Sequence, residues 1–108
     1  MVTAMLRVLC KLEDLSFLRF TPVSQEESVQ LAERGFQQAC ARAGLPVWVF
    51  SGPKVWRRPE AAPQWYHYDW ESTVKGAHVS VRVLVGAKGK VQWTVSGDIE
   101  RMRLITTR

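Results

Sequence analysis

Six polar side chains in the second half of the chain are the residues whose types could carry chemistry. They are two histidines, three acids and an arginine: His67, Asp69, Glu71, His78, Arg82 and Asp98. A histidine beside carboxylates can act as a general base, and two histidines with carboxylates can bind a divalent metal ion. Opposite charges that face each other across strands also stabilise a solvated sheet face, by roughly 0.2–1 kcal/mol per pair. We therefore interpret this polar patch first as a paired sheet surface, then as a binding surface, and last as a catalytic or metal site.

The chain carries no motif that would make catalysis or metal binding specific. The sequence contains no H-x-x-x-H, no C-x-x-C pair, no Gly-rich phosphate loop and no nucleophile elbow. We therefore expect a protein that is not an enzyme, with no catalytic residue, no cofactor and no metal ion.

A second candidate is the basic stretch "PKVWRRP" (53–59), in which Lys54, Arg57 and Arg58 surround Trp56. Positive charges beside an aromatic ring suit nucleic acid, through phosphate contacts and base stacking. The competing interpretation is a basic loop whose tryptophan folds onto the domain edge under the arginine stems. The net charge of +5 fits nucleic acid, an acidic partner or simple solubility.

The third candidate is an aromatic set that includes Trp48, Trp56 and Trp65. Both alternating rows of "VWVF" (47–50) are apolar, which predicts a strand covered on both faces. The cover is either the helix and sheet of the same chain or a second chain, and tryptophan is enriched at interface hot spots. The sequence therefore favours a protein partner or a homodimer.

The leading expectation is a small non-enzymatic binding protein that uses this aromatic surface, as a dimer. One alternative is a nucleic-acid-binding protein that uses the basic loop. The other is a small-ligand-binding or catalytic protein that uses the polar patch.

One long helix is well marked in the sequence and is expected over 25–43. Ser24 and Glu27 form the capping-box pattern, and Gly44 followed by Pro46 marks the end. One face of this helix is apolar and rich in alanine, which suits close packing on a sheet. It carries Val29, Ala32, Phe36, Ala39, Cys40 and Ala43.

Three runs after the helix alternate with the period of strands, at 64–72, 77–85 and 91–96. A row with two acids and a histidine is not a core row, so the opposite row of each strand should face the helix. Tyr68, Val81 and Val95 are then expected in the core beneath Phe36.

Loop lengths predict how these strands pair. A loop at 73–76 places Glu71 opposite His78, and a loop at 86–90 places Val83 opposite Trp93 and His78 opposite Asp98. A slip of one residue would send every side chain to the other face. This register is what gathers the polar patch.

The element order predicts a single α+β domain over 1–108, with one long helix on a curved antiparallel sheet. A strand or helix is expected near 5–18, and a last strand in the tail "IERMRLITTR". The β-α-β-β-β-β order is similar to that of cystatin-like folds. This likeness is in element order only, and it implies no functional residue.

Two cysteines, Cys10 and Cys40, are too few for a disulfide scaffold, and Cys40 should be a buried thiol. No apolar run is long enough to span a membrane. We therefore expect a cytoplasmic protein that does not bind membranes.

Overall fold

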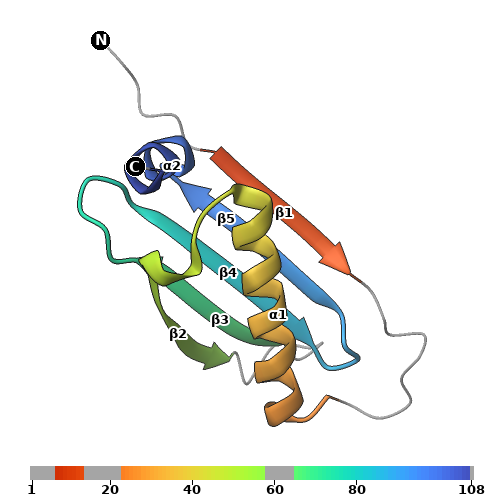
Figure 1. The fold of residues 1–108 in the computed structure, drawn as a ribbon. Helices are drawn as coiled ribbons and strands as arrows, with labels where there is room; N and C mark the ends of the chain where they lie inside the picture. The colour runs from red at the N-terminus through yellow and green to blue at the C-terminus, as the bar shows by residue number, and fades with distance from the viewer. Residues whose placement is uncertain (1–6, 14–22, 58–64, 108) are drawn as a thin grey trace.

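The computed structural model describes residues 7–13, 23–57 and 65–107, which form two helices, one short 3₁₀ turn and five strands (Figure 1). In chain order the elements are β1 (Arg7–Glu13), α1 (Gln25–Ala43), the 3₁₀ helix η2 (Val47–Val49), β2 (Phe50–Arg57), β3 (Trp65–Ser72), β4 (Val79–Gly86), β5 (Val91–Gly97) and α2 (Ile99–Thr106). The predicted α+β class and element order are confirmed through β5.

The five strands form one antiparallel sheet in the order β1-β5-β4-β3-β2. Strands β2 to β5 follow one another as a meander, and α1 carries the chain from the β1 edge to the β2 edge. The helix crosses one face of the sheet, above β4 and β5 (Figure 1). The opposite face, called the open face below, is covered by no helix of the described residues.

Helix α1 begins and ends as its sequence predicts. Ser24 Oγ accepts from the Glu27 amide at 3.2 Å, and a Glu27 carboxylate oxygen accepts from the Ser24 amide at 3.4 Å. At the other end Gly44 adopts a left-handed conformation with φ 71°, and the Leu45 amide donates to the Cys40 carbonyl at 2.9 Å. These contacts satisfy backbone groups that a helix end leaves without intrahelical partners.

The core lies between α1 and the sheet, on the face that the alternation predicts. Tyr68, Val81 and Val95 are buried on this covered face, and Phe36 stacks on Trp70 with ring centroids 4.3 Å apart. Two polar groups in this layer are hydrogen-bonded across it. The Tyr68 and Ser28 hydroxyls lie 2.5 Å apart, and Trp93 Nε1 donates to Gln38 Oε1 at 3.1 Å.

The pairing of β4 with β5 has the predicted register, with Val83 opposite Trp93 and Val81 opposite Val95. The predicted pairing of β3 with β4 is wrong by two residues, because Glu71 lies opposite Ser80 and not His78. The connecting loop covers 73–78 and is longer than expected.

Side-chain contacts make this longer loop favourable. Ser72 Oγ donates to the Ala77 carbonyl and accepts from the Val79 amide, each at 3.1 Å, and Ala77 joins the core. A shift of two residues keeps every side chain on its predicted face, because the period of a strand is two.

The predicted last strand is also wrong, because residues 99–106 form helix α2. Gly97, with φ 118°, turns the chain out of β5, and Ile99 and Met102, spaced as on one helix face, are buried against the core. Arg103 Nε donates to the Ala43 carbonyl, which joins α2 to the end of α1. Neither described helix is both long and apolar enough to cross a membrane.

The stretch "VWVF" is not the strand that its composition predicts. Residues 47–49 form the 3₁₀ turn, and β2 begins at Phe50. The stretch "SGPK" (51–54), whose residue types favour a turn, lies within β2, where the pairing with β3 shifts between Ser51 and Lys54. A 3₁₀ turn sends successive side chains to different sides, so Val49 is buried while Trp48 is exposed.

Candidate functional site

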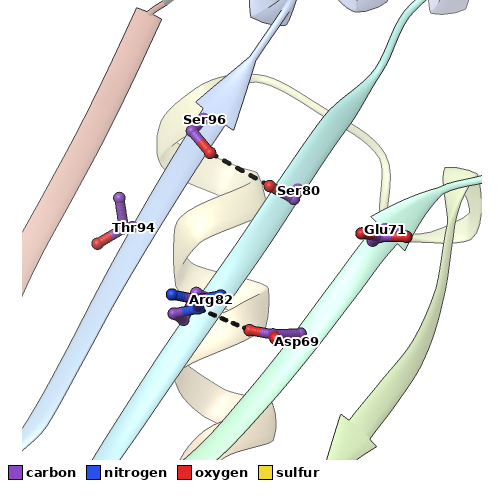
Figure 2. Close-up of a pocket in the computed structure, with 6 residues that line it drawn as sticks. All are labelled: Asp69, Glu71, Ser80, Arg82, Thr94 and Ser96. Carbon is purple, nitrogen blue, oxygen red and sulfur yellow. Dashed lines mark hydrogen bonds and ion pairs between the residues drawn. The ribbon is translucent and has the colours of Figure 1, made fainter.

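A polar hollow of about 270 Å³ lies on the open face of the sheet, across β3, β4 and β5 (Figure 2). It is lined by Asp69, Glu71, Ser80, Arg82, Thr94 and Ser96. Asp69, Glu71 and Arg82 belong to the predicted polar patch, and the three hydroxyl residues are additions to it.

Strand register positions these side chains in two rows. In one row Lys54, Asp69, Arg82 and Thr94 follow one another across neighbouring strands. In the other row Glu71, Ser80 and Ser96 do so. Residues that lie directly opposite share a face, so the rows meet on the open side.

The contacts inside the hollow are those of a paired sheet surface. Arg82 Nε lies 2.9 Å from Asp69 Oδ1, and the Ser80 and Ser96 hydroxyls lie 3.2 Å apart (Figure 2). Glu71 is exposed at the edge of the hollow. This set offers carboxylates, a guanidinium and hydroxyls to a polar ligand.

Neither histidine lines the hollow. His67 lies opposite Leu84 on the open face, with its Nδ1 shielded from solvent. His78 lies just before β4, two residues from Ser80, but it does not line the hollow. Asp98 is the neighbour of His78, as predicted, but His78 contacts it through its backbone and not through its imidazole. The Asp98 carboxylate accepts from the His78 amide at 3.4 Å, and the Asp98 amide donates to the His78 carbonyl at 2.9 Å.

The predicted pairing of His78 with Glu71 is therefore wrong, whereas that of His78 with Asp98 is found. Among the residues that the structure describes, no group of three or more His, Cys, Asp or Glu side chains is placed to hold a metal ion. The hydroxyl residues Ser80, Thr94 and Ser96 were the missing part of the patch. Their outward alternation along β4 and β5 was the signal that could have found them.

An apolar groove of about 300 Å³ lies on the other side of the molecule, between α1 and β2. Phe36, Phe50, Pro53 and Trp70 supply its aromatic and apolar walls, together with Val47 and Gly52, while Glu33 and Gln37 form a polar rim on α1. Phe36 and Phe50 meet edge to face, with ring centroids 5.6 Å apart.

Beside the groove, the turn of Val47–Val49 presents Trp48 to solvent. Trp48 is 71% exposed and Val47 is 47% exposed. The turn itself is anchored, because Val49 is buried and its carbonyl accepts from the Thr73 amide at 2.7 Å and from Thr73 Oγ1 at 3.2 Å. Trp48 is thus a large apolar side chain held outward by a fixed backbone.

The other predicted binding residues are placed less completely. Lys54 is exposed and lies opposite Asp69, a carboxylate that offsets its charge. The backbone of Trp56 pairs with His67, but the side chains of Trp56 and Arg57 and the whole of Arg58 lie outside the described part of the structure. Trp65 is half-buried, and its ring packs close to Gly86.

No protein-family model, curated protein or solved structure matches this chain. The polar hollow, the apolar groove and Trp48 are the features of the described residues that bear on function.

Proposed function

We propose that this protein is a small non-enzymatic binding domain whose contact surface is Trp48, Val47 and the apolar groove beside them. The observation that carries the proposal is the 71% exposure of Trp48 on an anchored turn. Exposing an indole to water is unfavourable, and a fixed backbone keeps the side chain from turning inward. A protein partner that covers Trp48 removes this cost.

The surroundings of Trp48 support a protein as the partner. Exposed Val47 lines the groove beside Trp48, exposed Val55 lies further along β2, and Glu33 and Gln37 line the groove with polar groups from α1. An apolar centre with a polar rim is the usual composition of a protein–protein interface. Rigid aromatic anchors of this kind supply most of the binding energy in such interfaces.

The polar hollow supports catalysis less well. Its arginine and one of its carboxylates are paired with each other, and neither histidine lines it. It contains no nucleophile positioned by a base, which acyl or phosphoryl transfer would need. Two carboxylates beside one arginine also disfavour phosphate, so the hollow is a poor site for nucleic acid.

Cross-linking from position 48 tests the proposal. We would replace Trp48 with a benzophenone-bearing phenylalanine and irradiate the cells in which the protein is native. We expect discrete protein adducts from position 48 and none from the same group at Leu104, which is 72% exposed on α2. In the purified complex, Trp48→Ala should then weaken binding about tenfold or more, whereas Leu104→Ala should leave it unchanged.

Two outcomes would contradict the proposal. Equal cross-linking from positions 48 and 104 would show that Trp48 is merely exposed. Adducts that nuclease removes, with binding that weakens steeply as salt rises, would identify the nucleic-acid alternative instead.

A further inference from the structure

We infer that the partner at the Trp48 surface is a second copy of this chain, with each Trp48 inserted into the apolar groove of the other copy. This inference rests on the proposed function and names its partner. The resulting dimer is two-fold symmetric, so both insertions form together.

The chain carries both halves of such a contact side by side. Val47 lines the groove, and Trp48 is the next residue of the same turn. Trp48 does not enter the groove of its own copy, because consecutive side chains of a 3₁₀ turn point about 120° apart. A two-fold axis that passes near Val47 brings the indole of one copy to the groove of the other.

The groove suits an indole in both shape and chemistry. Phe36, Phe50 and Trp70 line it, and Phe50 is the most exposed of the three, so an incoming aromatic side chain would pack chiefly against Phe50. Its volume of about 300 Å³ is at the small end of ligand pockets, which fits one large side chain. On the rim, the Glu33 carboxylate and the Gln37 amide offer acceptors for the indole N–H.

Pairing of β2 edges is a poor alternative route to a dimer. Strand β2 is an edge of the sheet, but Pro53 has no amide to donate and the register shifts between Ser51 and Lys54. Lys54 also places a charge on this edge, and charge, proline and irregularity are how edge strands avoid pairing. The side-chain contact through Trp48 avoids this obstacle.

The area available predicts a weak dimer. An aromatic side chain buries about 150–250 Å² when covered. Two reciprocal insertions, with the groove walls that they cover, bury on the order of 600 Å², about half of the smallest stable interface. Val47, Val55 and polar residues of α1 must supply the rest. We therefore expect a dissociation constant in the micromolar range, roughly 1–100 µM.

Sedimentation analysis over a concentration series is the first test. The wild-type protein should change from the chain mass of 12.3 kDa to twice that value as its concentration rises through the micromolar range. Trp48→Ala should raise the dissociation constant about tenfold or more, and Leu104→Ala, equally exposed but remote in the chain, should not change it.

Mixing two variants tests the reciprocal geometry. Trp48→Ala removes the indole and keeps the groove, whereas Gln37→Arg obstructs the groove and replaces an acceptor on its rim. Each variant alone should be monomeric at concentrations where the wild type is dimeric. Mixed together, they should associate more tightly than either variant alone and more weakly than the wild type, because one of the two insertions can still form. Circular dichroism should show that both variants remain folded, since both positions are exposed.

The outcomes separate this inference from the proposed function. A wild type that stays monomeric, while position 48 cross-links to a different protein, would overturn the dimer and keep the proposed function. No adduct from position 48 would overturn both. Dimers that form without any gain on mixing the two variants would overturn the reciprocal insertion, and would indicate that the two Trp48 side chains meet each other instead.

Discussion

The two faces of strand β4 show how one short segment serves two purposes. Val81 is buried beneath α1, while its neighbour Arg82 keeps more than half of its side chain in water on the open face. Two tryptophans show the same contrast. Trp93 is 3% exposed and hydrogen-bonded to Gln38 on α1, whereas Trp48 is 71% exposed. The covered face therefore holds the groups that stabilise the fold, whereas Arg82 and Trp48 lie largely in water.

The sharpest way to test this contrast is to truncate the two tryptophans. Trp93→Ala should lower the free energy of unfolding by about 3–5 kcal/mol, because it leaves a large cavity and removes the partner of Gln38. Trp48→Ala should change it by about 0.5 kcal/mol or less. Urea denaturation at concentrations where the protein is monomeric measures both. Similar losses for the two variants would show that Trp48 contributes to the fold.

Adjacent residues of β4 give a smaller version of the same test. Val81→Ala should cost about 1–3 kcal/mol, from lost burial and the cavity that remains. Ser80→Ala, on the open face, should change stability by about 0.5 kcal/mol or less. Chemical denaturation measures both changes in the free energy of unfolding, and an unchanged m-value would show that each variant unfolds like the wild type. A larger loss for Ser80 than for Val81 would mean that the faces are assigned in reverse.

The ion pair in the polar hollow should matter less still. A double-mutant cycle with Asp69→Ala and Arg82→Ala should give a coupling energy of about 0.2–1 kcal/mol, since Arg82 is more than half exposed and water screens the pair. The coupling should shrink in 0.5 M salt. A salt-independent coupling above about 2 kcal/mol would show that the hollow excludes water, and would favour the ligand-binding alternative.

The smallest effect concerns the thiol of Cys40, which should be inert in the folded protein. Burial raises the pKa of Cys40 to about 12, so the reactive thiolate is scarce near neutral pH. In a Cys10→Ser variant, where Cys40 is the only thiol, a thiol-specific reagent should modify it only as fast as the protein unfolds. Rapid labelling at pH 8 would contradict its burial.

The same shift in the pKa of Cys40 predicts how stability changes with pH. Above the ordinary value of 9.0 the unfolded chain releases this proton first, while the folded chain retains it up to about pH 12. The unfolded state then binds fewer protons than the folded state, so stability falls as pH rises through this window. Below pH 9 this group should contribute no pH dependence.

Local patterns in the sequence were enough to predict much of the fold. The capping box, the glycine after the helix and the apolar spacing defined α1, because helix ends and faces depend on neighbours within four residues. Alternation along β3, β4 and β5 identified the buried rows, since a strand has a period of two whatever it pairs with. The glycine-containing loop at 86–90 also determined the register of β4 with β5.

Features that depend on contacts between distant segments were decided only by the tertiary structure. The register of β3 with β4 follows from Ser72 contacting Ala77 and Val79, which extends the loop by two residues. Helix α2 is stabilised because Ile99 and Met102 are buried in the core and Arg103 donates a hydrogen bond to the Ala43 carbonyl at the end of α1. The apolar spacing of so short a segment is compatible with either a helix or a strand, so the sequence does not show which of the two forms at 99–106.

The candidate sites divide in the same way. Residue types alone singled out the polar patch and the aromatic stretch, because charged and aromatic side chains are the ones that recognise ligands. Which of them meet depends on register, so the structure removed the histidines from the patch and added the hydroxyls. The groove between α1 and β2 is lined by residues as far apart in the sequence as Glu33 and Trp70. The exposure of Trp48 follows from a 3₁₀ turn, which the apolar sequence "VWVF" does not distinguish from a strand. Burial is a property of the assembled layers, and for that reason the sequence could name the aromatic residues but not which of them would face water.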